Sequence, residues 1–267
     1  MIDLITKALA CAHDVLVGLG NKGRTEVTDI RTVDISTVGD HAVSESLIQF
    51  FRAAKLPALI MSEESGLVEL SRHPELILVF DDLDGTDNFY RGEGLLPYCS
   101  VIAVLEGTSP RFADTLCAGV IEHRTGALWL AERGKGATFN GAPARTSSRQ
   151  HVDRRTLIAV DHYGSYSAMD QLASLHTTAW IKDFGSSALH LAGVSSGIFD
   201  AYVTSAQKGH EIAAGYLLIS EAGGSVTSFK GKSIENDAYD FNATYEIAAC
   251  ATIDLGRAVL GLLSRSE

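Results

Sequence analysis

The chain has 267 residues and a mass of 28.5 kDa, enough for one large domain or for two domains that share a cleft. Its net charge of −11 and pI near 5.2 argue against nucleic acid and anionic membranes as direct partners. No apolar run reaches the length of a membrane span, and the N-terminus does not resemble a signal peptide, so we expect a cytoplasmic protein.

The first half of the chain predicts two helices followed by a series of strands. Apolar residues at helical spacing predict helices over residues 2–19 and about 40–54, with a polar loop at 21–31 and Asp40 in the first turn of the second helix. Two short apolar strands are expected at residues 58–61 and 77–80. The strand-like segments 100–105, 116–121 and 127–131 that follow have the spacing of an antiparallel meander, with a further short strand among the turns of 134–147.

A polar, charged segment near residue 147 predicts a boundary between two halves, residues 1–147 and 148–267. Strand and helix patterns alternate in the second half, as in a layered α/β domain. The expected strands are 157–160, 180–184, 201–203, 225–227 and 246–251, and the expected helices are 166–176, 186–196, 210–222 and 254–264.

The stretch ILVFDDLDGTDNF, residues 77–89, places three acids directly after a short apolar run. A buried strand that ends in acids brings like charges together, and a cation would neutralise them. A second apolar strand runs into Glu63, and carboxylate-only clusters suit hard divalent cations, Mg²⁺ or Mn²⁺. The candidate ligands from this reasoning are Glu63, Asp81, Asp84 and Glu211.

Gly85 and Thr86 follow the acids, and a helix that begins there would offer free amides as an anion pocket beside the cations. This combination indicates phosphoryl chemistry. One alternative is that the acids are solvated turn residues, although three acids ending in Asp-Gly-Thr favour the metal site. A second alternative is the nucleophile loop of haloacid-dehalogenase-type phosphatases, in which Asp82 would be phosphorylated.

Taken together, the motifs resemble the inositol monophosphatase family, lithium-sensitive and Mg²⁺-dependent phosphatases of sugar phosphates. The family pattern Asp-Pro-Ile-Asp-Gly-Thr-x-Asn-Phe is similar to residues 81–89, with Asp82 in place of proline, and the upstream Glu-Glu-Ser is similar to residues 63–65. Residues 134–141, GKGATFNG, resemble the family's Gly-x-Gly-Ala-x-x-Asn-Gly.

The family's Trp-Asp-x-Ala-Ala-Gly helix is similar to the segment that begins at His210 and Glu211, so the carboxylate is kept with one more methylene. The sequence assigns no role to His210. A plainer interpretation makes Glu211 a helix N-terminal acid that is stabilised by the helix dipole.

The resemblance implies an α/β (α+β) fold, a layered αβαβα sandwich of the inositol monophosphatase and fructose-bisphosphatase type, with two to three Mg²⁺ ions between its halves and Mn²⁺ as an option. Implied metal ligands are Glu63, Asp81 and the Leu83 carbonyl for a first ion, Asp81, Asp84 and Glu211 for a second, and Glu63 for a looser third. Implied catalytic residues are Glu63 and Thr86, which hold the attacking water, and Asp40, which orients the Thr86 hydroxyl. Implied substrate contacts are Asp84, Gly85, Thr86, Gly185, Ser186, Ser187, Thr204 and Glu211.

The expected activity is that of a phosphoric monoester hydrolase acting on a small polyol or sugar phosphate by in-line attack, with inositol monophosphate first and fructose 1,6-bisphosphate next. Thr204 stands where inositol-selective members carry Glu, a departure that bears on inositol specificity. The alternatives are a 3′-phosphoadenosine 5′-phosphate-type phosphatase and a non-catalytic regulatory relative. Family members are often dimers, and the sequence neither supports nor excludes a homodimer.

Overall fold

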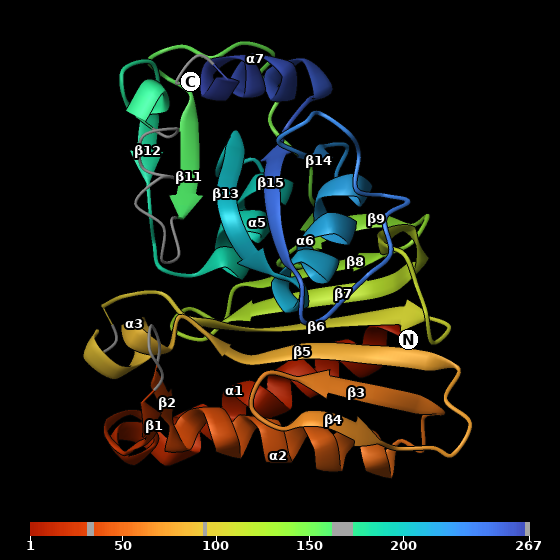
Figure 1. Ribbon diagram of the computed structural model, residues 1–267. Helices are drawn as coiled ribbons and strands as arrows, with labels where there is room; N and C mark the ends of the chain where they lie inside the picture. Colours follow the sequence, from red (N-terminus) through yellow and green to blue (C-terminus); the bar gives the residue numbers. More distant parts are fainter. Residues whose placement is uncertain (31–34, 93–94, 162–172, 265–267) are drawn as a thin grey trace.

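Five layers of secondary structure, helix, sheet, helix, sheet and helix, follow one another from bottom to top in the computed structural model (Figure 1). The structure describes residues 1–30, 35–92, 95–161 and 173–264. The layer order confirms the αβαβα sandwich expected from the sequence. No helix in the described part of the chain has the length and apolarity that crossing a membrane requires.

Two helices, α1 (Ile2–Thr25) and α2 (Val38–Ala53), cover the lower face of the larger sheet in one buried apolar cluster. The described residues place eight strands in this sheet, in the order β10-β9-β8-β7-β6-β5-β3-β4. Strands β3 and β5 are parallel and all other neighbours are antiparallel. The antiparallel run β6-β7-β8 confirms the predicted meander. The strands are β3 (Ala58–Ser62), β4 (Gly66–Glu69), β5 (Leu76–Asp84), β6 (Cys99–Glu106), β7 (Thr115–Glu122), β8 (Leu128–Glu132), β9 (Gly136–Phe139) and β10 (Ala142–Pro143).

The middle layer consists of α5 (Ser187–Ser195) and α6 (Gly209–Glu221), which pack between the two sheets. The second sheet has the strand order β12-β11-β13-β15-β14 among the described residues, and α7 (Ile253–Leu263) covers its outer face. Its strands are β11 (Leu157–Asp161), β12 (Trp180–Lys182), β13 (Ala201–Lys208), β14 (Ser225–Ser228) and β15 (Thr244–Cys250). Smaller elements are β1 (Val27–Ile30), β2 (Ile35–Thr37), α3 (Thr86–Arg91) and the 3-10 turn η1 (Phe112–Asp114).

The largest buried cluster lies between the two sheets and draws side chains from both halves of the chain. Val79 of β5 and Val101 of β6 share it with Leu218 of α6 and Ala249 of β15. The two sheets therefore use separate stretches of sequence but one continuous core. The division into residues 1–147 and 148–267 stays a prediction.

Three predicted elements differ from the structure. Helix α1 does not end near Gly20: that residue takes φ 52° and ψ −134°, which glycine tolerates, and the helix resumes to Thr25. Arg24 in the last turn donates a 3.0 Å hydrogen bond to the Tyr90 carbonyl, which holds this turn in place, and β1 follows where a loop was predicted. Strand β5 continues through its acids to Asp84. The helix predicted at 166–176 lies mostly outside the described residues, and 173–176 are helical.

Helices α5 and α6 approach each other closely at Gly215. A Cβ atom there would lie 2.4 Å from Leu191 Cδ1 and 2.7 Å from Leu191 Cβ. We expect Gly215→Ala to lower the free energy of unfolding by about 1–3 kcal/mol, because the helices must separate. The measurement is urea-induced unfolding.

Gly261→Ala is the matched control for this prediction. Gly261 is also helical, and no neighbouring atom lies within 4 Å of a Cβ built there. We expect this change to raise the free energy of unfolding by about 0.5–1 kcal/mol through helix propensity. Equal effects of the two substitutions would contradict the close packing of α5 on α6.

Candidate functional site

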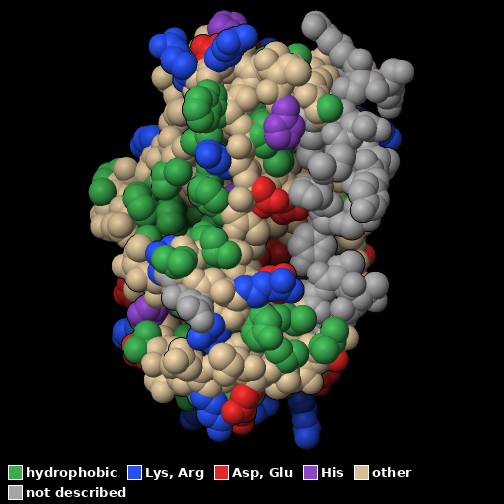
Figure 2. All heavy atoms as spheres, turned by 90° about the vertical axis from the view of Figure 1, so that its left-hand side faces the viewer, with side chains coloured by type: hydrophobic (Ala, Val, Ile, Leu, Met, Phe, Trp, Pro, Cys, Tyr) green, Lys and Arg blue, Asp and Glu red, His purple; other side chains and the backbone are tan. Residues whose placement is uncertain are grey.

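A cavity of about 370 Å³ opens where the carboxyl end of β5 meets the beginnings of α3 and α6. Figure 2, which faces the left-hand side of Figure 1, shows acidic side chains in a hollow between the two halves. The cavity is lined by residues from both halves of the chain, so the site is complete only when the halves are packed together.

Four predicted ligands meet in this cavity. Asp81, Asp84 and Glu211 are all buried, and each offers an oxygen within 4.8 Å of the others. Glu63 joins Asp81 in a second group of the same kind, whose third member is His210. Glu211 therefore points into the cluster, rather than serving only as an acid at a helix end.

The end of β5 arranges its acids through a local irregularity. The pairing of β5 with β6 shifts register between Asp81 and Asp84, and the Leu83 amide donates a 3.0 Å hydrogen bond to Asp81 Oδ1. Asp81 and Asp84 consequently line the cavity, and so does Leu83, whose carbonyl is a predicted ligand.

Asp82 does not line the cavity. Its Oδ2 accepts hydrogen bonds from the Ser62 hydroxyl at 3.0 Å and the Glu64 amide at 3.3 Å, and the residue is 1% exposed. Side chains alternate across a strand, so Asp82 points away from its neighbour Asp81. This geometry speaks against Asp82 as a phosphorylated nucleophile. Because its two donors flank Glu63 in sequence, Asp82 instead holds the turn that carries Glu63.

Burial and mutual repulsion both disfavour charge on the acids of the cluster. Burial, followed by the carboxylates of Glu63, Asp84 and Glu211, raises the pKa of Asp81 well above its ordinary range. Burial and Glu211 raise the pKa of Asp84 to about 7, although the Ser186 hydroxyl and the Ala188 amide each donate to its Oδ2 at 2.7 Å. These carboxylates can all be ionised together only if a cation lies among them.

The donor set fits a divalent cation. The buried Glu211 Oε2 has no hydrogen-bond partner among the described residues, and an unsatisfied buried oxygen is costly unless something binds it. Clustered carboxylates are ligands that Mg²⁺ and Mn²⁺ prefer. Asp81, Asp84, Glu211 and Glu63 are therefore suited to hold such ions, and ligation by the Leu83 carbonyl stays a prediction.

Thr86, the first residue of α3, is tied to the start of α2. Its hydroxyl lies 2.8 Å from Asp40 Oδ1 and 2.9 Å from the Leu83 carbonyl. Asp40 closes a capping box with Thr37, accepting from the Thr37 amide at 2.7 Å and from its hydroxyl at 2.5 Å. Burial raises the pKa of Asp40 to about 7. Helix α3 begins after Gly85, as predicted, and Gly85 takes φ 89°.

The other predicted substrate residues divide into two groups. Gly185 and Ser187 line the cavity, and the Ser187 hydroxyl contacts Asp161 Oδ2 at 2.5 Å. Ser186 is turned toward Asp84, and Thr204 is fully buried, 3.5 Å from Asp161 Oδ1. Neither of these two side chains lines the cavity, and their contact with a substrate stays a prediction.

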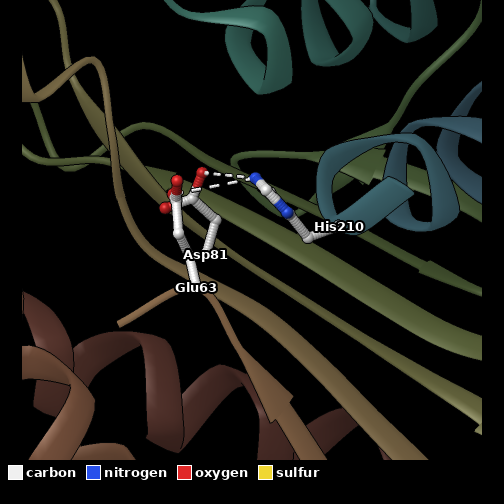
Figure 3. Close-up of side chains that lie close together, drawn as sticks. All are labelled: Glu63, Asp81 and His210. Atoms are coloured by element: carbon white, nitrogen blue, oxygen red, sulfur yellow. Dashed lines mark ion pairs between the residues drawn. The ribbon is translucent and has the colours of Figure 1, made fainter. Parts of the chain in front are cut away.

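Two basic side chains at the start of α6, Lys208 and His210, were not assigned from the sequence (Figure 3 shows the histidine). Lys208 Nζ lies 2.8 Å from Glu63 Oε1, and His210 Nε2 lies 3.7 Å from Glu63 Oε2. Burial opposes a charge on His210, but Glu211 and then Glu63 outweigh it, and the pKa of His210 is raised. The sequence signal that could have identified them is their position, since Lys208 lies three residues and His210 one residue before the predicted ligand Glu211.

The comparison with known families agrees with this geometry. Residues 3–259 match the inositol monophosphatase family. The chain belongs to the inositol monophosphatase family. This is a family of phosphatases whose enzymes use Mg²⁺, and the acidic cluster fits such an ion.

Individual members of the inositol monophosphatase family are similar over most of the chain. A protein of Methanothermobacter thermautotrophicus named fructose-1,6-bisphosphatase/inositol-1-monophosphatase is 29% identical, over 84% of this chain and 81% of its own length. A protein of Xylella fastidiosa named Nus factor SuhB is 32% identical, over 86% and 82%. The solved structure of the Thermotoga maritima IMPase superposes with a TM-score of 0.82 at 24% identity, covering 99% of this chain and 96% of that one, which supports the fold.

The raised pKa of Asp40 predicts a pH-dependent contribution to stability. Between pH 4 and 7, folded Asp40 keeps a proton that the unfolded chain releases, because its pKa is raised from 3.8 to about 7. Stability from this group therefore falls with rising pH, by at most about 1.4 kcal/mol per pH unit. The advantage of wild type over Asp40→Asn in urea unfolding, with EDTA present, is expected to shrink across this window.

The difference in free energy of unfolding between wild type and Asp40→Asn isolates Asp40, because groups whose pH dependence has the opposite sign contribute equally to both proteins. Burial lowers the pKa of His123 to about 3, so His123 makes stability rise with pH between about 3 and 6.5 in both proteins. Parallel stability curves for wild type and Asp40→Asn would contradict the assignment.

Proposed function

We propose that the chain is a Mg²⁺-dependent phosphomonoesterase that releases phosphate from a small polyol or sugar phosphate, with inositol monophosphate as the first candidate. The observation that carries this proposal is the convergence of Glu63, Asp81, Asp84 and Glu211 on one cavity, beside the Thr86–Asp40 pair. Family membership gives it independent support.

Divalent cations in this cluster would supply a lowered pKa for the attacking water and stabilisation of charge on the phosphoryl and leaving oxygens. The chain's own residues would position that water. The Thr86 hydroxyl has one hydrogen and two neighbouring acceptors, and donation to an ionised Asp40 leaves its lone pairs to accept from the water. The Glu63 carboxylate, on the cavity wall, would take the proton that the water loses.

The amides at the start of α3 and the residues Gly185 and Ser187 are proposed to hold the substrate. At about 370 Å³ the cavity is near the small end of ligand pockets, which suits a single sugar or polyol. Asp161 and Asp183 also line it, and Lys208 is the one lysine or arginine among the described lining residues. Carboxylates can accept from hydroxyl groups but repel a second phosphate, which favours a monophosphate over fructose 1,6-bisphosphate.

A second candidate is a non-catalytic, regulatory role. The specific observation in its favour is the similarity to a relative named Nus factor SuhB. The carboxylate set argues for catalysis, because a binding protein has no need to hold the buried Asp81 and Glu211 and the partly buried Glu63 together against their repulsion.

The test is phosphate release from inositol 1-phosphate, fructose 1,6-bisphosphate and 3′-phosphoadenosine 5′-phosphate, with Mg²⁺ and with EDTA. We expect Mg²⁺-dependent turnover that lithium inhibits, and the highest kcat/KM for the monophosphate. Glu63→Gln keeps the shape but removes the proton acceptor, so kcat should fall by about 10²–10⁴. A folded, Mg²⁺-loaded chain without turnover on any of these esters would favour the regulatory role.

Asp82→Asn is the matched control for Glu63→Gln. Its amide oxygen can still accept from Ser62 and Glu64, so we expect kcat to stay within about tenfold of wild type. Loss of turnover in Asp82→Asn, together with a trapped aspartyl phosphate in wild type, would restore the haloacid-dehalogenase interpretation.

A further inference from the structure

His210 brings a ring nitrogen into a cluster of oxygen ligands. The residue begins α6 and is 3% exposed, and its imidazole points across the cavity at the carboxylates of Asp81 and Glu63 (Figure 3). Its Nε2 lies 3.3 Å from Glu211 Oε2, 3.6 Å from Asp81 Oδ2 and 3.7 Å from Glu63 Oε2.

These separations differ from those of ordinary hydrogen bonds. An N–H···O bond spans about 2.7–3.2 Å, and all three distances are longer. Around an octahedral ion with ligand bonds of about 2.1 Å, neighbouring ligand atoms lie about 3.0 Å apart and opposite ligand atoms about 4.2 Å apart. The distances from Nε2 to Asp81 and Glu63 fall between these limits, as expected for ligands of a shared ion.

An orphaned oxygen supports the same conclusion. Within the described residues, the buried Glu211 Oε2 has no hydrogen-bond partner, and an unsatisfied buried oxygen is costly unless something binds it. An ion binds the Nε2 of an imidazole only after a proton leaves that nitrogen, so a divalent ion would replace the proton between Nε2 and the carboxylate oxygens.

The surrounding packing fixes the imidazole in this direction. A Cβ atom at Gly209 would lie 2.4 Å from the Asp240 carbonyl oxygen, so the backbone before His210 lies directly against that segment. The Phe241 ring packs on the imidazole with centroids 5.5 Å apart. Glu63 has separate uses for its two oxygens, because Oε1 pairs with Lys208 while Oε2 faces His210.

We propose that His210 Nε2, Glu63 and Asp81 together ligate one divalent ion, and that this mixed nitrogen–oxygen site binds Mn²⁺ and Zn²⁺ more tightly than Mg²⁺. Imidazole is a good ligand for first-row transition metals and a poor one for Mg²⁺, which prefers oxygen. The inference deepens the proposed phosphatase function and rests on it, since the same ion would serve the reaction.

The test uses the purified full chain, stripped with EDTA and loaded with Mn²⁺. Pulsed electron paramagnetic resonance should detect coupling of Mn²⁺ to an imidazole ¹⁴N in wild type, and His210→Gln should lose it. Competition titrations should show the preference for Mn²⁺ over Mg²⁺ falling roughly tenfold in the variant. His73→Gln, which changes an exposed histidine outside the cluster, should keep both properties.

The result that overturns the inference is Mn²⁺ bound to wild type without nitrogen coupling, or coupling that survives in folded His210→Gln. Should His210→Gln fail to fold, wild type labelled with ¹⁵N-histidine replaces it, because the ¹⁴N pattern must then change to that of ¹⁵N. Phosphate release is measured separately. Nitrogen coupling without turnover would count against the proposed function alone, and turnover without coupling against the ligand role alone.

Discussion

The constraint on which the site depends is the cost of holding several charged carboxylates together away from water. Three separate elements deliver them: the turn after β3 carries Glu63, the end of β5 carries Asp81 and Asp84, and the first turn of α6 carries Glu211. Removing such charges from water costs several kcal/mol per ion unless an opposite charge compensates. A fold that brings them together is therefore organised for cations, and the chemistry of phosphate esters follows from that.

The middle layer is what makes this concentration of charge possible. Helix α6 is buried on nearly every side between the two sheets, with Ile212 and Leu218 in the shared core. Gly215 allows α5 to pack directly against it, so the helix has little freedom to move away from the repelling acids. The apolar packing along α6 thus holds Glu211 in a position that its own electrostatics disfavour.

Local patterns predicted much of this structure, and long-range contacts account for the rest. The apolar periodicity of α2 and the short apolar runs of β3 and β5 are properties of neighbouring residues, so the sequence reveals them. The extension of α1 beyond Gly20 is accompanied by a contact between Arg24 and Tyr90, 66 positions apart. The pairing of Lys208 with Glu63 joins residues 145 positions apart, and no pattern of spacing reveals it.

The two departures from the family motif at the start of α6 belong together in space. Glu211 reaches one methylene further than the aspartate of the motif, and its Oε2 lies 3.3 Å from the Nε2 of His210, the residue that replaces the motif's tryptophan. The longer side chain of Glu211 lets its carboxylate reach the cluster beside the imidazole of His210. A tryptophan in place of His210 would offer only a donor N–H and no lone pair for an ion. The adjacent substitutions therefore act as one change, which adds a nitrogen ligand while it keeps the number of carboxylates constant.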